Sequence, residues 1–461
     1  MQQADLDEDQ DTEQLNGQRR KALDTARPAT VAAVVCPVAS GPRGEVRDRE
    51  ARLAEAVGLA RAIDLDVRLA EAVPLRRPTP ATLLGKGVVE RIGEAVESQE
   101  IGLVVVDDRL TPVQQRNLEK AWQTKVIDRT GLILEIFGAR ARTHEGRLQV
   151  ELAALDYQRG RLVRSWTHLE RQRGGFGFMG GPGESQIEID RRLIGERIVR
   201  IKRDLESVRR TRSVNRAGRR KARLPTVALV GYTNAGKSSL FNRLSGAEVM
   251  AKDLLFATLD PTMRAIKLPN GLGCVISDTV GFVSDLPTHL VAAFRATLEE
   301  VIEADLIVHV RDISHPDSER QRLDVEAVLR ELGVSEEGGG GRPMIEALNK
   351  IDALDEEARA TLRARCATGA ERARQYPVSA VSGEGVDALL EAIGDFLGRA
   401  SETREVAVPL SDGATIAWLY RHGEVRSRHD DGELARLTVA LDPAASAQLE
   451  RRLIEHRPAA H

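Results

Sequence analysis

A short apolar stretch, residues 226–230, leads directly into a glycine-rich segment that ends in lysine and serine, and a helical pattern follows. In this context the spacing G-x-x-x-x-G-K-[S/T] predicts a phosphate-binding loop. Glycines let backbone N–H groups curl around phosphates, and the N-terminus of the following helix adds a positive dipole. The residues of the predicted loop are Gly231, Tyr232, Thr233, Asn234, Ala235, Gly236, Lys237 and Ser238.

Three further short motifs follow, and each comes at the end of an apolar stretch. Asp278, Thr279, Val280 and Gly281 supply a carboxylate for a magnesium shell and a glycine N–H for a γ-phosphate. In the second motif Asp352 can accept hydrogen bonds from N1–H and the exocyclic amine of guanine, whereas adenine has no matching pair of donors. The second motif consists of Asn349, Lys350, Ile351 and Asp352. The third motif consists of Ser379, Ala380 and Val381. Together the motifs predict a site for GTP and GDP.

The segment between the phosphate-binding loop and Asp278 is expected to be a switch that orders around Mg²⁺ when GTP is bound. Thr258 and Thr262 compete for the role of the metal-binding threonine. We favour Thr258, because Pro261 restricts the chain next to Thr262. We expect Ser238 and Thr258 to bind Mg²⁺. The switch residues assigned to the nucleotide site are Phe256, Ala257, Thr258, Leu259 and Asp260.

The residue after the glycine of the first motif is Phe282, where many GTPases have a glutamine that orients water. A phenyl ring cannot orient water, so a partner or a cation is expected to complete the site. We assign catalysis to Lys237 and to Asn234, which stands three residues before the lysine, where a K⁺ could lie beside the phosphates. The alternative for Asn234 is an ordinary loop asparagine that hydrogen-bonds its own backbone.

Composition and patterning place this site within a larger molecule. The 461 residues carry a net charge of -3, only 3% are aromatic and three are cysteines without metal-ligand spacing. These features predict an α/β protein of a reducing cytoplasm, and no apolar run is long enough for a membrane span. We predict a disordered acidic tail (1–27), an α/β domain (28–142), a helical hairpin with a basic linker (143–224), a P-loop domain (225–400) and a small α+β domain (404–461), in which Trp418 and Tyr420 are core residues.

The hairpin is predicted from two apolar seams, one between residues 148 and 169 and the other between 187 and 208. Between them Gly174–Ser185 is rich in glycine, yet it contains Phe176 and Phe178, which either fold back on the hairpin or insert into a partner. Residues 191–223 hold 14 Lys/Arg and 3 Asp/Glu. Such a cationic stripe suits a nucleic-acid backbone.

The motifs GYTNAGKSSLFN, LFATLDPT, DTVGFVSDLP and NKID, with LDYQRGRLVRSWTHLERQRGG and GPGESQIEIDRRL upstream, resemble those of the HflX family of translational GTPases. The resemblance runs from about residue 30 to the C-terminus. It implies an N-terminal HflX domain, a GTPase domain and a small C-terminal domain. It also implies binding to the large ribosomal subunit and its ribosomal RNA, with the glycine-rich loop directed toward the catalytic centre, and splitting or rescue of stalled ribosomes under stress. The glycine-rich segment Gly174–Ser185 reads GGFGFMGGPGES and differs from the GGIGxRGPGET of many members of the family.

Other functions remain open on the sequence. A GTPase of ribosome assembly or RNA modification would use the same parts, and a binding module whose GTP site only stabilises the fold is a third possibility. A second nucleotide site in the N-terminal domain rests on fold analogy alone. We expect a cytoplasmic monomer that associates with ribosomes or with the membrane surface.

Overall fold

The computed structural model describes residues 29–39, 48–172, 186–222, 224–246, 255–256, 258–284, 298–334, 342–367, 374–399, 402–422, 424–441, 449 and 452–453. The predicted acidic tail, the glycine-rich tip and Ala257 lie outside these residues. The chain forms two compact units. Unit 1 consists of Met1–Ala139 and Tyr157–Glu184, and unit 2 of Arg140–Asp156 and Ser185–His461.

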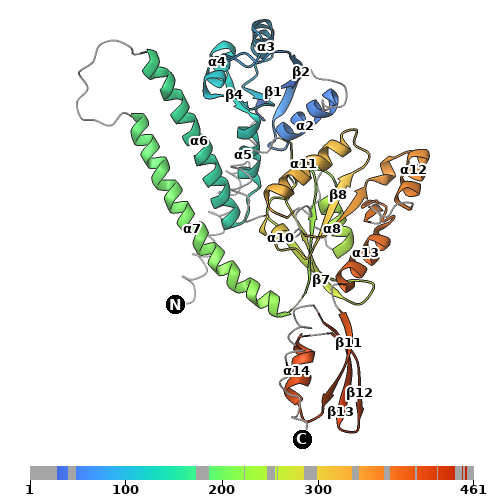
Figure 1. Ribbon diagram of the computed structural model, residues 1–461. Helices are drawn as coiled ribbons and strands as arrows, with labels where there is room; N and C mark the ends of the chain where they lie inside the picture. Colours follow the sequence, from blue (N-terminus) through green and yellow to red (C-terminus); the bar gives the residue numbers. More distant parts are fainter. Residues whose placement is uncertain are drawn as a thin grey trace, which may run out of the picture. The chain divides into compact units, whose positions relative to one another are not determined.

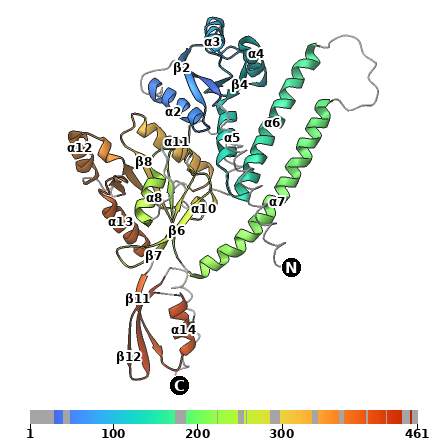
Figure 2. The same ribbon diagram turned by 180° about the vertical axis from the view of Figure 1, so that it is seen from behind.

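Unit 1 contains a parallel four-stranded sheet in the order β2-β1-β3-β4 (Figures 1 and 2). Strands and helices alternate along this unit, as in an α/β domain, and apolar strands such as β3 are buried under amphipathic helices. Thr111 caps the N-terminus of α4, in a capping box with Gln114. The elements are β1 (Val31–Ala39), α2 (Arg49–Arg61), β2 (Asp66–Leu75), α3 (Lys86–Ser98), β3 (Leu103–Val106), α4 (Pro112–Trp122), β4 (Lys125–Asp128) and α5 (Arg129–Arg140).

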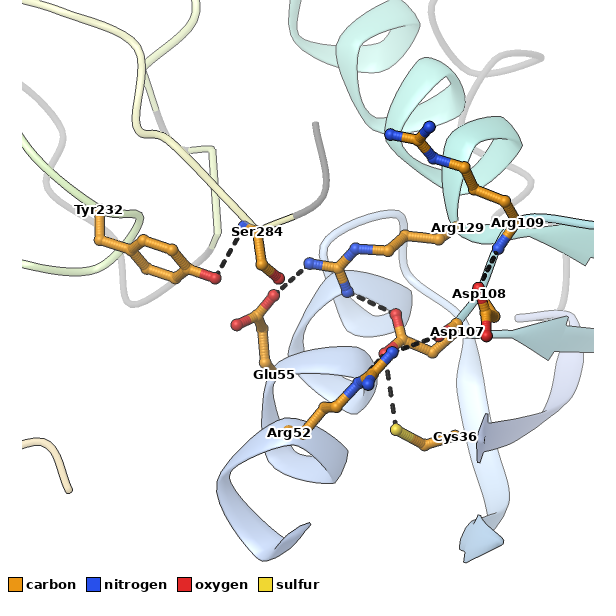
Figure 3. A network of polar contacts seen from close by, with 9 residues as sticks. All are labelled: Cys36, Arg52, Glu55, Asp107, Asp108, Arg109, Arg129, Tyr232 and Ser284. Atoms are coloured by element: carbon orange, nitrogen blue, oxygen red, sulfur yellow. Dashed lines mark hydrogen bonds and ion pairs between the residues drawn. The ribbon is translucent and has the colours of Figure 1, made fainter. Parts of the chain in front are cut away.

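A buried group of ion pairs lies in this unit, at the end of β3 and the start of α5 (Figure 3). Arg129 lies between the carboxylates of Asp107 and Glu55 and pairs with both. Arg52 and the thiol of Cys36 also contact Asp107. Burial raises the pKa of Asp107, but the arginines outweigh this effect and hold the pKa below its usual range. The cluster is therefore internally neutralised.

The predicted hairpin helices are α6 (His144–Gln172) and α7 (Gln186–Ala222). Within unit 2, the first part of α6 packs on α7 through a core that includes Leu148, Ile201 and Leu205. Arg197 of α7 pairs with Glu151 of α6 at 2.7 Å. Residue numbers rise along α6 as they fall along α7 at these contacts, so the helices are antiparallel, as the apolar seams predicted.

Unit 2 contains a six-stranded sheet in the order β10-β9-β8-β5-β7-β6, in which only β6 is antiparallel to its neighbour. The carboxyl ends of the parallel strands share one edge, and ligands of open α/β sheets bind at this edge. The strands are β5 (Thr226–Val230), β6 (Thr262–Lys267), β7 (Gly273–Asp278), β8 (Leu306–Asp312), β9 (Met344–Asn349) and β10 (Gln375–Pro377). The helices are α8 (Lys237–Ser245), α10 (Glu299–Ile302), α11 (Ser318–Glu331), η1 (Ile351–Ala353), α12 (Glu356–Ala367) and α13 (Val386–Arg399).

A third sheet lies near the end of the chain and has the order β11-β13-β12. Its elements are β11 (Glu402–Pro409), α14 (Gly413–His422), β12 (Glu424–Asp431) and β13 (Leu434–Leu441). Trp418 lies in its core as predicted, but the prediction for Tyr420 is wrong, because that side chain is 54% exposed. Trp418 and Tyr420 are two positions apart on α14, which places them on opposite faces of the helix.

Candidate functional site

The predicted phosphate-binding loop connects β5 to α8 and takes a conformation that depends on its glycines. Gly236 has φ +89°, and a Cβ there would lie 2.2 Å from Nδ2 of Asn349. A Cβ on Gly231 would lie 2.2 Å from the carbonyl oxygen of Val310. Asn234 has φ +59°, a conformation that asparagine tolerates better than most residues. This backbone therefore requires the residue types that the motif supplies.

Lys237 is the first residue of α8, and its side chain is buried. Its Nζ donates to the carbonyl oxygens of Gly231 at 3.2 Å and Tyr232 at 2.8 Å. Burial lowers the pKa of Lys237 to about 8, although the nearby carboxylate of Asp278 opposes this change. Among the residues that the structure describes, the ammonium group has no direct ion pair, and an anionic ligand would raise its pKa again.

Three oxygen atoms converge beside Lys237. The Ser238 hydroxyl donates to Oδ2 of Asp278 at 2.7 Å, and Oγ1 of Thr258 donates to the same oxygen at 3.0 Å. The two hydroxyl oxygens are 2.9 Å apart. Thr262 instead begins β6, where it is paired with Asp278 in the ladder to β7. The structure therefore brings Thr258, and not Thr262, to the predicted metal ligand Ser238.

These oxygens fit a hard cation. Asp278 is fully buried, and its Oδ1 has no hydrogen-bond partner among the residues that the structure describes. Burial raises its pKa, an effect that Ser238, Lys237 and Thr258 oppose. Hydroxyl and carboxylate oxygens are the ligands that Mg²⁺ prefers. In the described part of the chain no group of three or more His, Cys, Asp or Glu side chains forms another candidate metal site.

The residues after Asp278 cross close to the phosphate-binding loop. Thr279 and Val280 are buried, and the Thr279 hydroxyl donates to the carbonyl of Leu229 at 2.6 Å. Phe282 donates its backbone N–H to Gly231 at 3.1 Å and accepts from Thr233 at 2.7 Å. The side chain of Phe282 is 1% exposed, so its ring is packed in the interior. A Cβ on Gly281 would lie 3.1 Å from Nζ of Lys237, which places this glycine beside the lysine.

The Asn349 motif follows β9 and is tied to the phosphate-binding loop. Asn349 donates its side-chain amide to the carbonyl of Ala235 at 2.8 Å and accepts from the backbone N–H of Ala380 at 3.0 Å. Lys350 has φ +65° and pairs with Asp312, the last residue of β8, at 2.8 Å. Asp352 is exposed, and its carboxylate makes no hydrogen bond or ion pair within the described part of the chain. It is therefore available to a ligand.

The third motif forms a tight turn after β10. Ser379 is buried, and its hydroxyl accepts from the N–H of Ser382 at 3.0 Å, while Val381 is 74% exposed. Arg243 of α8 donates to the carbonyls of Ala380 and Val381. Sequence reasoning missed Arg243. Arg243 and Ala380 are 137 positions apart, and no motif or spacing in the sequence indicates that they are in contact.

The remaining predicted residues fall in the switch segment. Phe256 and Leu259 are buried, and Ile351 of the guanine motif is buried as well. Asp260 was expected at the nucleotide, but in the structure its carboxylate contacts the backbone and side chain of residues 142 and 143, at the start of α6. The role of Asp260 at the nucleotide stays a prediction.

Family models match nearly the whole chain. Residues 50–138 match a model described as GTP-binding GTPase N-terminal, and residues 140–219 match one described as GTP-binding GTPase Middle Region. Residues 226–350 match a model described as 50S ribosome-binding GTPase, and 365–461 match the HflX C-terminal domain.

Curated proteins are similar over most of their length. GTPase HflX of Magnetococcus marinus is 51% identical over 398 residues, which cover 86% of this chain and 90% of the relative. GTPase HflX of Escherichia coli is 42% identical over 387 residues, which cover 83% of this chain and 87% of the relative. A solved GTP-binding protein from Sulfolobus solfataricus in complex with GDP is 24% identical, covers 80% of this chain and 99% of that chain, and has a TM-score of 0.42. None of the helices in the described ranges combines the length and the apolar character needed to cross a membrane.

Proposed function

The chain belongs to the HflX family of GTPases, and on that premise we propose that it is a nucleotide-controlled switch on the large ribosomal subunit that splits or rescues stalled ribosomes. The observation that carries the proposal is the convergence of Lys237, Ser238, Thr258 and Asp278 at one sheet edge, in a chain that also carries the antiparallel hairpin α6–α7. We place its action in the cytoplasm, as a monomer, in contact with ribosomal RNA.

Each site residue has a role in binding GTP that follows from its position. Lys237 would exchange its two backbone carbonyl partners for β- and γ-phosphate oxygens. Asp352 would accept the two donors of guanine, and Ser379, Ala380 and Val381 would contact the base through the backbone. Asn349 holds the base-binding and phosphate-binding loops together.

Ser238 and Thr258 would bind Mg²⁺, and Asp278 would accept hydrogen bonds in its outer shell. Bound Mg²⁺ would neutralise charge on the phosphates during hydrolysis. Because only a γ-phosphate extends to the switch, Thr258 would be fixed in the GTP state and released in the GDP state.

Where many GTPases use a glutamine to orient the attacking water, this chain has Phe282, whose ring is buried and cannot take that role. We therefore propose that the ribosome stimulates hydrolysis. A K⁺ ion beside Asn234 is a second component of this proposal, and equal turnover in K⁺ and Na⁺ would remove it. Asn234 is exposed on the loop, where it is accessible to such an ion.

Binding to ribosomal RNA is supported by the charge of α7. Its described part between residues 188 and 208 exposes several cations, and the chain continues with further arginines up to residue 223. Phosphate contacts of this kind weaken as salt rises. Charge reversal along Arg209–Arg223, whose side chains lie outside the described residues, is expected to weaken ribosome binding and flatten its salt dependence.

The proposal is tested by sedimentation of the full-length protein with ribosomes or isolated subunits, with phosphate release measured in the same tubes. We expect binding to the large subunit to require a GTP analogue and turnover to rise with ribosomes. Lys237→Ala, which removes the phosphate contact, is expected to abolish both. Binding to assembly precursors alone, or to free RNA alone, would favour the assembly or modification function, and ribosomes that release no phosphate above background would contradict the proposed switch.

A further inference from the structure

The switch segment has a contact that its motif does not explain. Oδ2 of Asp260 accepts from the backbone N–H groups of Arg142 and Thr143, both at 3.0 Å. Oδ1 accepts from the Thr143 hydroxyl at 2.5 Å. The three donors come from the two residues that precede α6, so one carboxylate of the switch segment is bound to the base of the hairpin.

The base of α6 is shaped to receive this carboxylate. The Thr143 hydroxyl oxygen also accepts from the N–H of Gly146 at 3.0 Å, so Thr143 caps the first turn of α6, while Asp260 satisfies the N–H groups of the two residues before the helix. A Cβ on Gly146 would lie 2.7 Å from Oδ1 of Asp260, closer than real Cβ atoms approach other atoms. A negative charge at a helix N-terminus is favourable as well. The contact therefore depends on a glycine, a threonine and an aspartate from distant parts of the chain.

The same segment is fixed at two other points. Thr258, two residues before Asp260, contacts Ser238 and Asp278. Thr262, two residues after it, is paired with the backbone of Asp278 in the sheet. Asp260 therefore lies in the short segment between the predicted metal site and β6. Its carboxylate hydrogen-bonds this segment to the residues before α6.

We propose that Asp260 is a positioning residue for GTP hydrolysis, which holds Thr258 at the metal site by binding the segment to the base of α6. This inference rests on the proposed function. The position of Arg142 and Thr143, at the start of α6, then determines how closely the Thr258 hydroxyl approaches Mg²⁺ and the γ-phosphate. Conversely, release of Thr258 after hydrolysis loosens a contact of the hairpin. One element, α6, is thereby linked to the state of the nucleotide by a chain of hydrogen bonds.

The linkage predicts a selective defect in Asp260→Ala of the full-length protein. Single-turnover hydrolysis of GTP is expected to fall about ten-fold, with and without ribosomes, because Thr258 is no longer held in place. Affinity for a non-hydrolysable GTP analogue should fall, while affinity for GDP should stay within about two-fold, since GDP does not engage Thr258. Fluorescent nucleotide titration and quenched-flow phosphate release measure these quantities.

Matched variants separate positioning from folding. Asp412→Ala removes another helix-capping carboxylate of the same unit, which accepts from the N–H of Thr415 at 2.9 Å, and it is expected to leave hydrolysis unchanged. Thr143→Val, which lacks the hydroxyl, should show a smaller defect than Asp260→Ala, and Thr143→Ser should restore the wild-type rate.

Two results would overturn the inference. One is a wild-type rate of hydrolysis in Asp260→Ala, and the other is an equal loss of GTP and GDP affinity, which would assign Asp260 to the fold of the nucleotide site. If ribosomes fail to stimulate even the wild-type protein, the proposed function fails. The role of Asp260 is still tested by comparing the rates of GTP hydrolysis of Asp260→Ala and the wild-type protein without ribosomes.

Discussion

The side-chain amide of Asn349 lies 2.8 Å from the carbonyl oxygen of Ala235, so the end of β9 is hydrogen-bonded to the phosphate-binding loop. The other end of the same amide accepts from the N–H of Ala380. One buried asparagine therefore connects three motifs that are widely separated in the sequence. The glycine at position 236 is part of this arrangement, because any side chain there would collide with the amide.

Asn349→Ala is expected to weaken binding of GTP and GDP alike. It removes both hydrogen bonds and leaves the buried N–H of Ala380 without that partner, at a cost of about 3 kcal/mol or about 100-fold in affinity. Asn349→Asp keeps an acceptor for Ala380 but turns a buried carboxylate oxygen toward the carbonyl oxygen of Ala235, so it should weaken binding at least as much. Calorimetric titration measures the affinities, and unchanged binding in Asn349→Ala would show that the bridge does not support the site.

Asp352→Asn is expected to change the choice of base. The amide can no longer accept two hydrogen bonds from guanine, but it can donate one to the additional carbonyl of xanthine. We expect GTP affinity to fall about 100-fold and XTP to become the preferred nucleotide. Asp355→Asn, which changes a helix-capping carboxylate three residues further on, should keep the preference for GTP. The assignment is contradicted if competition assays with GTP and XTP give wild-type ratios for Asp352→Asn.

Nucleotide binding is expected to be coupled to protonation of Lys237. In the structure burial lowers the pKa of this lysine to about 8, and bound phosphates would raise it again. Below pH 7 the lysine is already charged, but above pH 8 it must take up a proton when nucleotide binds. We expect uptake of about three quarters of a proton at pH 8.5 and about a tenth at pH 7. Calorimetry in buffers of different ionisation enthalpy measures this uptake, and equal values at both pH values would contradict the prediction.

His309 should make the stability of the nucleotide-binding unit depend on pH. It lies on β8, is 1% exposed and has no partner for Nδ1 among the described residues. Burial and the nearby cations Arg311, Arg322 and Lys237 lower its pKa to about 3. Below about pH 6.5 the imidazole binds a proton in the unfolded chain but not in the folded chain. The free energy of unfolding therefore decreases as the pH is lowered from about 6.5 to about 3.

Between pH 7.5 and 5.5 this effect is worth about 1.4 kcal/mol of unfolding free energy. His309→Phe, which keeps a ring but cannot titrate, should lose that part of the pH dependence whatever its stability at pH 7.5. Urea unfolding of the full chain at the two pH values, followed at the transition of unit 2, measures the difference. The prediction fails if both proteins lose the same free energy.

Arg129→Met should destabilise unit 1. The change leaves buried Asp107 with Arg52 as its remaining cation and removes Arg129 from partly buried Glu55, and breaking a buried pair typically costs about 3–5 kcal/mol (Figure 3). Arg91→Met removes an exposed pair with Glu71 in the same unit and should cost about 0–1 kcal/mol. Denaturant unfolding of the three proteins gives the comparison, and similar costs for the two variants would show that burial of the Arg129 cluster adds nothing.

The sequence by itself determined several of the elements and predicted the chemistry of the site. The apolar pattern predicted β5 and the two hairpin helices α6 and α7, because burial on one or both faces of an element requires apolar residues at regular spacing. The phosphate-binding loop was recognisable because its backbone tolerates only glycine at Gly231 and Gly236. Tyr420 was misplaced because a short helix shows its faces only once it has packed.

Only the tertiary structure decided which distant residues meet. Packing brings Thr258 to Ser238 and pairs Thr262 with Asp278 in the sheet. The contact of Arg243 with Ala380 likewise depends on how α8 packs beside the turn after β10. Asp260 is the clearest case. Its motif assigned it to the nucleotide, whereas packing placed its carboxylate at the N–H groups before α6, 117 residues away. Local pattern specifies elements, but long-range hydrogen bonds depend on how those elements pack.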